Sequence, residues 1–145
     1  MFLYKCKLKP KEYMKEKYFS FLKGIKDIDG KVEKFWVKNK DKIRKNLFQN
    51  KKNVVVISAS PEFLLKDICK ENGIETVIAT IVDKRNGSFL SKNCYGKEKV
   101  KRLNNQCKAY WINEFYTDSL TDKYLAQISK TSFLVKKDKV EEWKC

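Results

Sequence analysis

The spacing of apolar residues divides the chain into two regions. Residues 11–22 and about 31–49 carry apolar side chains three and four positions apart, among lysines and glutamates. This period predicts two amphipathic helices at the start of the chain. Beyond them the pattern changes to short β-branched and aromatic runs, at 54–57, 76–82, 109–116 and 132–135. Strands that alternate with helices favour an α/β fold with a parallel sheet.

The segments between these runs predict the connecting elements. Ser60 is expected to cap a helix that begins at Pro61 and ends near Gly73. The other predicted elements are a turn at 83–87 that opens a hairpin into 88–90, a helix over 97–103 and a short helix through 124–128. The sequence shows no repeat or low-complexity linker, so its 145 residues fit one compact α/β unit.

Composition then narrows the possible chemistry. The chain has no histidine, and its five cysteines form no Cys-x-x-Cys pair. Cys/His zinc sites and nucleophiles activated by histidine are therefore excluded. An odd number of scattered cysteines fits reduced thiols better than a disulfide framework. Any chemistry must therefore be carried out by carboxylates, hydroxyls, lysines or a metal ion bound through oxygen.

The formal charge of +15 raises the question of a nucleic-acid partner. Only three of the 33 basic residues are arginine, and the lysines are spread along the chain without forming one tract. This distribution favours a solvated basic surface over a specific nucleic-acid face. No apolar run approaches the ~20 residues that span a bilayer, and residues 1–10 do not form a secretory signal. We therefore expect a cytoplasmic protein with no transmembrane segment.

Ligands of open parallel sheets bind beyond the carboxyl ends of strands, and three such positions carry useful groups. Ser58 follows the first run, ahead of a predicted helix start that could bind an anion. Lys97 and Lys99 follow Gly96 at the start of a later helix. Each of these features taken alone is more often structural, as a helix cap or a solvated lysine.

The third position, 117–122, places the carboxylates of Asp118 and Asp122 four residues apart after the third run. Oxygen ligands in such an arrangement suit Mg²⁺, which keeps several waters and binds a few carboxylates together with phosphate. An Asp cap and a solvent-facing Asp are the alternative.

In this order the three features resemble the motifs of haloacid dehalogenase-like phosphatases of the phosphoserine phosphatase branch. The matching runs are Val54-Val55-Val56-Ile57-Ser58-Ala59-Ser60-Pro61-Glu62, Asn93-Cys94-Tyr95-Gly96-Lys97-Glu98-Lys99-Val100 and Phe115-Tyr116-Thr117-Asp118-Ser119-Leu120-Thr121-Asp122. The resemblance implies a Rossmann-like parallel sheet and Mg²⁺-dependent hydrolysis of a small phosphomonoester. The substrate could be phosphoserine, another small ester or a lipid phosphate.

The same resemblance implies roles for individual residues. Ser58 and the backbone amide of Ala59 would hold the phosphate. Lys99 would neutralise its charge, with Lys97 as a close rival. Asp118 would be a Mg²⁺ ligand, and Asp122 would be a second ligand or would support the first.

The sequence departs from the family at the nucleophile. Family members begin with an apolar strand that ends in Asp-x-Asp-Gly-Thr, and here residues 1–49 match the helical cap that follows it, ahead of a core at 50–145. Asp27-Ile28-Asp29-Gly30 has part of this spelling, but it lies between two predicted helices, and Lys31 stands where Thr is expected. We interpret it as a linker and helix cap.

These observations predict an incomplete core that lacks the central nucleophile strand, as in an N-terminally truncated and inactive phosphatase. Two alternatives remain open: a non-catalytic phosphate-binding or regulatory protein, and a basic protein that binds polyanions. The missing strand could also come from a separate N-terminal segment, or the exposed strand edges could be covered by self-association.

Overall fold

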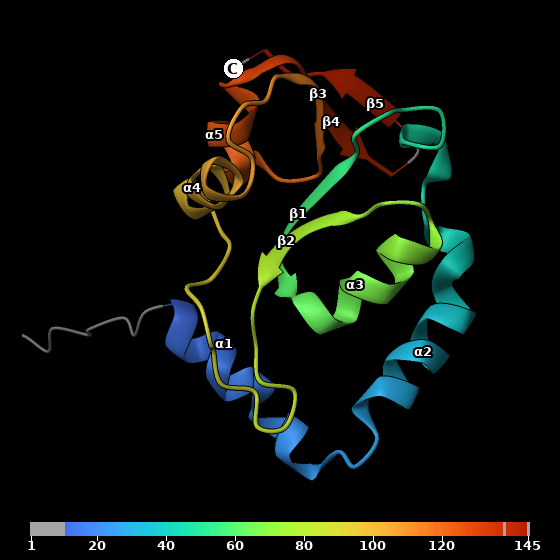
Figure 1. Cartoon of the computed structure of the whole chain (residues 1–145), viewed down its shortest axis with the longest axis vertical. Coiled ribbons are helices and arrows are strands. Elements are labelled where there is room, and N and C mark those ends of the chain that lie inside the picture. The colour runs from blue at the N-terminus through green and yellow to red at the C-terminus, as the bar shows by residue number, and fades with distance from the viewer. Residues whose placement is uncertain (1–10, 138, 145) are drawn as a thin grey trace, which may run out of the picture.

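The computed structural model describes residues 11–137 and 139–144. The chain opens with helix α1 (Lys11–Phe19), which continues into the 3-10 turn η1 (Ser20–Gly24), and with helix α2 (Ile28–Asn39). In Figure 1 these helices flank helix α3 (Glu62–Glu71), which lies between them. None of the described helices is long and apolar enough to cross a membrane.

The prediction that the second helix reaches residue 49 was wrong. Helix α2 ends at Asn39, and the 3-10 turns η2 (Lys40–Lys42) and η3 (Lys45–Leu47) follow it. The Asn39 side chain donates to the Phe35 carbonyl at 2.7 Å. A side-chain bond of this kind competes with the helical hydrogen bonds and favours a helix end.

Strand β1 (Val55–Pro61) pairs in parallel with strand β2 (Thr76–Thr80), and α3 connects them. The expected cap at Ser60 was wrong, because β1 continues through Pro61 and α3 begins at Glu62 without a side-chain cap. The Ser60 amide donates instead to Ser58 Oγ at 3.1 Å. The regular pairing of β1 with β2 is therefore interrupted after Ile57, where this hydrogen bond lies.

A hairpin follows β2, as the sequence predicts, with an antiparallel bridge between Val82 and Phe89. Gly87 closes its turn with a φ of +80°, a conformation that glycine adopts readily. The hairpin contacts the N-terminal helices, since the Phe89 amide donates to the Glu16 carboxylate at 2.9 Å. Helix α4 (Lys97–Gln106) comes next in the chain.

The C-terminal part forms a second sheet. Strand β3 (Ile112–Thr117) pairs in parallel with β4 (Ser129–Lys136), and the short elements η4 (Leu120–Asp122) and α5 (Lys123–Ala126) connect them. Strand β5 (Lys139–Glu142) adds to β4 in antiparallel orientation. The sequence prediction missed β5, since four residues rich in charge carry little strand signal.

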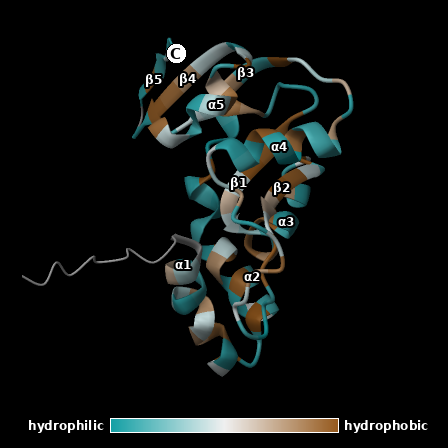
Figure 2. Cartoon of the chain, turned by 90° about the vertical axis from the view of Figure 1, so that its left-hand side faces the viewer, coloured by the Kyte–Doolittle hydropathy of each residue, from teal (hydrophilic) through white to brown (hydrophobic). Residues whose placement is uncertain are grey.

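The mixed α/β class and the parallel pairing agree with the prediction, but the described strands form two sheets, β1-β2 and β3-β4-β5. One cluster of buried side chains joins them: Ile78, Cys94, Leu103 and Leu125, with Ile57 and Ile112 partly buried against it. In Figure 1, β1 and β3 lie at adjoining ends of the two sheets, and α4 and α5 lie together on one side. Figure 2 shows apolar residues gathered around β1, β2 and α4, with hydrophilic residues on much of the helical surface. Within the described chain, β1 and β3 each have one unpaired edge.

Candidate functional site

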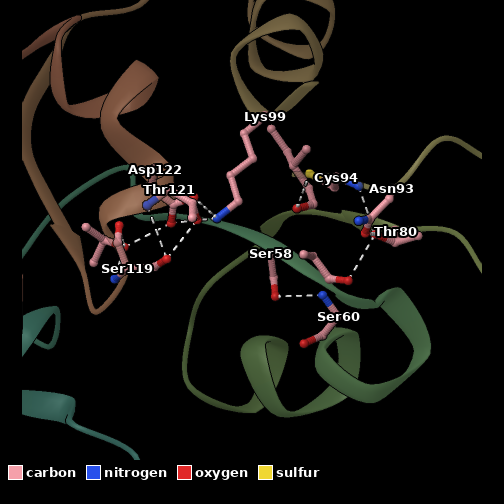
Figure 3. Close-up of polar contacts among 12 residues, drawn as sticks. Ser58, Ser60, Thr80, Asn93, Cys94, Lys99, Ser119, Thr121 and Asp122 are labelled. Carbon is pink, nitrogen blue, oxygen red and sulfur yellow. Dashed lines mark hydrogen bonds and ion pairs between the residues drawn. The ribbon is translucent and has the colours of Figure 1, made fainter. Parts of the chain in front are cut away.

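A buried ion pair connects helix α4 to the loop after β3. Lys99 lies in the first turn of α4, and its Nζ is 2.7 Å from both Oδ1 and Oδ2 of Asp122. Each side chain is only 9% exposed. Thr117 Oγ1 donates a further hydrogen bond to Asp122 Oδ2 at 2.9 Å. The pair therefore fixes the relative positions of α4 and the carboxyl end of β3, as Figure 3 shows.

One oxygen of this carboxylate retains an unused lone pair. Asp122 Oδ1 is buried and has no hydrogen-bond partner of good geometry within the described chain, although the Lys99 ammonium is close to it. Buried carboxylate oxygens normally have such a partner, because burial without one is costly. Asp122 Oδ1 is thus ion-paired to Lys99 and can still accept a hydrogen bond, for example from a water molecule bound to a cation.

The loop that carries Asp118 is held by its own side chains. The Ser119 amide donates to Thr117 Oγ1 at 3.1 Å, and the Thr121 amide donates to Ser119 Oγ at 3.3 Å. Asp118 is exposed on this loop, whereas Asp122 is buried. Among the described residues there is no group of three side chains of the types that bind metals through His, Cys, Asp or Glu. The roles of Asp118 and Asp122 as metal ligands stay predictions.

Ser58 lies in β1 just after its regular pairing with β2 ends at Ile57; the residue is half-buried, and its hydroxyl accepts from the Ser60 amide. In Figure 3 the Lys99 side chain extends from α4 toward the strand ends, with Asp122 on one side and Ser58 on the other. The structure therefore brings Lys99 and Asp122 into contact and places Ser58 and Ala59 at the neighbouring strand end. That Ser58 and Ala59 bind phosphate stays a prediction.

A buried threonine, which the sequence prediction missed, ties the Ser58 loop to the segment before α4. Thr80 is fully buried, and its hydroxyl accepts from the Cys94 amide at 3.0 Å. The same oxygen lies 3.2 Å from the Ala59 carbonyl and 3.3 Å from Asn93 Oδ1, and can donate its proton to either. The available signal was a polar residue inside a run that is otherwise mostly apolar, with Ile78 and Ala79 before it and Ile81 and Val82 after it.

The two candidate lysines have different surroundings. Lys97 is exposed, and its Nζ lies 5.3 Å from the centre of the Tyr124 ring, a cation–π contact. Lys99 is buried against Asp122, on the side of α4 that faces the strand ends. The structure therefore brings Lys99, and not Lys97, to the candidate site.

Cys94, although close to the site, is not a suitable nucleophile. Burial raises the pKa of its thiol above the usual range, and the nearby charges of Arg102 and Lys99 counteract that rise only in part. The thiol therefore stays protonated near neutral pH, whereas the thiolate is the reactive form.

The Asp27-Ile28-Asp29-Gly30 segment forms the start of α2. Asp27 is the N-cap, and its carboxylate accepts from the Gly30 amide at 3.0 Å. Asp29 is exposed and forms an ion pair with Lys84 at 2.8 Å. The interpretation of this segment as a linker and helix cap is confirmed.

Comparison with known proteins identifies the family. The family model for haloacid dehalogenase-like hydrolases matches residues 2–127, which is most of the chain. No curated protein and no solved structure matches the chain significantly. The match covers all of the residues that form the candidate site, and the α/β fold with parallel strands agrees with it. The chain therefore belongs to the haloacid dehalogenase-like hydrolases.

Proposed function

We propose that this chain forms the phosphate- and metal-binding half of a Mg²⁺-dependent phosphomonoester hydrolase of the phosphoserine phosphatase-like branch. The observation that carries the proposal is the buried Lys99–Asp122 pair beside the end of β1, with one Asp122 oxygen left without a hydrogen bond. A buried ammonium and a carboxylate with a spare lone pair suit a phosphate dianion together with a divalent cation.

Each residue of the site has a distinct part in this proposal. The Ser58 hydroxyl and the Ala59 amide donate hydrogen bonds to phosphate oxygens, and the Lys99 ammonium neutralises their charge. Asp118 and Asp122 would hold Mg²⁺, which, when bound, withdraws charge from the phosphoryl group. Residues 1–49 would act as a cap over the core at 50–145. The substrate would be a small phosphomonoester.

We propose that the reacting carboxylate comes from outside the described residues. Within the described chain β1 and β3 each have an unpaired edge, and Asp27 serves as the N-cap of α2. We propose that a strand bearing Asp-x-Asp-Gly-Thr completes the sheet there and that the chain alone has little or no activity. Such a strand would pair through the backbone groups of both edges.

The first test measures binding by thermal unfolding. Phosphate with Mg²⁺ should raise the melting temperature, since a ligand at 100 times its dissociation constant stabilises a protein by about 2.7 kcal/mol. Asp118→Asn should remove the Mg²⁺-dependent part of this rise, and Lys97→Met serves as the control that keeps it. No rise with phosphate in the wild-type chain would refute the proposed site.

The second test concerns turnover of an aryl phosphate in the presence of Mg²⁺. The chain alone should show none, and adding a peptide with the Asp-x-Asp-Gly-Thr strand should produce it. Turnover by the chain alone that Asp27→Asn abolishes would overturn the assignment of Asp27 as a cap. Binding of phosphate without turnover, even with the peptide, would instead identify a non-catalytic phosphate-binding protein.

A further inference from the structure

An apolar cavity of about 220 Å³, open to solvent on one side, lies between the N-terminal helices and the start of α3. Its walls come from η1, α2 and the β1–α3 junction, and include Leu22, Val32, Phe35, Pro61 and Phe63. Figure 1 shows these elements side by side in the lower half of the molecule. The cavity is thus formed jointly by the N-terminal helices and by the segment that follows Ser58.

The lining of the cavity selects against polar ligand groups. Of the described residues that line it, Lys31 alone carries a charge, and Lys31 is itself exposed at the rim. A polar or charged group placed among the other side chains would lose its water without gaining hydrogen bonds. The volume exceeds that of the apolar cavity of ~150 Å³ that admits benzene. A phenyl ring or a short alkyl chain therefore fits it by size and polarity.

The cavity is continuous in the chain with the proposed phosphate site. Pro61 follows Ser58 by three residues in β1, so their Cα atoms lie at most about 11 Å apart. Lys15 on α1 reaches the same loop, with its Nζ 3.4 Å from the Ala59 carbonyl. The pocket wall at Pro61 therefore follows closely in the chain on the residues proposed to hold the phosphate.

The walls of the cavity are fixed against each other by a direct hydrogen bond. The indole Nε1 of Trp36 in α2 donates to the Leu64 carbonyl in α3 at 2.6 Å. The Trp36 ring also packs edge-on against Phe35, which lines the cavity. This hydrogen bond joins α2 and α3, which both contribute residues to the wall of the cavity.

We propose that this cavity receives the organic group of the substrate, and that the substrate is the phosphomonoester of an apolar phenol or short-chain alcohol. The proposal rests on the proposed phosphatase function and names its substrate class. Lys31 at the rim complements the negative charge of such an ester. An amino-acid ester such as phosphoserine would instead bring an ammonium and a carboxylate to an apolar wall.

The test is calorimetric titration of the full chain, in the presence of Mg²⁺, with phenyl phosphate, inorganic phosphate and phosphoserine. Phenyl phosphate should bind about ten- to one-hundred-fold more tightly than the other two. This is the gain in affinity expected from burying an apolar group the size of a phenyl ring. Val32→Trp, which fills the cavity, and Phe35→Ser, which makes its wall polar, should each abolish this preference. Val37→Ser on the same helix is the control, because Val37 is 63% exposed and does not line the cavity.

The outcomes separate this inference from the function on which it rests. Equal affinity for all three ligands, or a preference that survives both cavity substitutions, overturns the substrate class and leaves the phosphate site intact. Absence of binding by inorganic phosphate and by the two esters overturns the proposed function and this inference together. If the cavity substitutions change only self-association, measured by sedimentation, the cavity is an interface between copies and the substrate assignment is wrong.

Discussion

Replacing Lys99 by methionine tests the central contact of the site. The substitution keeps a long side chain but removes the ammonium, and leaves the buried Asp122 carboxylate with only the Thr117 hydroxyl as donor among the described residues. Removing one partner of a buried ion pair costs about 3–5 kcal/mol. This is a large part of a total stability of about 5–15 kcal/mol. For a chain of this size we expect the melting temperature to fall by at least about 6 °C.

Urea unfolding followed by circular dichroism measures the loss, with Lys97→Met as the matched control on the same helix turn. Lys97 is exposed, so its substitution should shift the melting temperature by no more than about 2 °C. The double variant Lys99→Met/Asp122→Asn should regain more than half of the lost stability, because it no longer buries an unpaired charge. A loss below about 1 kcal/mol for Lys99→Met, or a double variant as unstable as the single one, would refute the reasoning.

Two further predictions concern the hairpin and the thiol. Gly87→Ala should destabilise the fold by about 2 kcal/mol or more, since Gly87 has a φ of +80° and its new Cβ would collide with the Phe19 backbone. Gly24→Ala should not destabilise the fold, because the space around its new Cβ is open. Equal losses of stability for the two variants in chemical unfolding would contradict this prediction. Burial raises the pKa of Cys94, so iodoacetamide should label Cys94 more slowly than the half-exposed Cys107, with a Cys94 rate that still rises above pH ~9. Peptide mass spectrometry measures both rates, and equal labelling at neutral pH would show that Cys94 is accessible.

Local patterns predicted much of the fold because they reflect local physics. The β-branched run at 54–57, the helix end near Gly73 and the turn closed by Gly87 all depend on neighbouring residues, and the structure has each of them. The end of α2 was missed because the hydrogen bond from the Asn39 side chain outweighs an apolar period that continues past it.

The sequence predicted the site residues that belong to the three motif-like runs, but not the contacts that the fold makes between them. The resemblance favours Lys99 over Lys97, and the structure agrees, because Lys99 lies on the same side of α4 as the buried Leu103, four residues on. The Lys99–Asp122 contact joins residues 23 positions apart through the fold of two elements. Thr80 connects two loops through the hydrogen bonds of a single hydroxyl, and the spacing of apolar residues along the chain cannot predict such a contact.

The two separate sheets have a consequence for amide hydrogen exchange. Successive amides of a parallel strand point to opposite sides, so β1 and β3 each present alternate N–H groups to a paired and to an unpaired edge within the described chain. Exchange should therefore alternate between slow and fast along these strands. A strand that entered between them would slow the fast set alone, so deuterium uptake would reveal its arrival even if no chemistry followed.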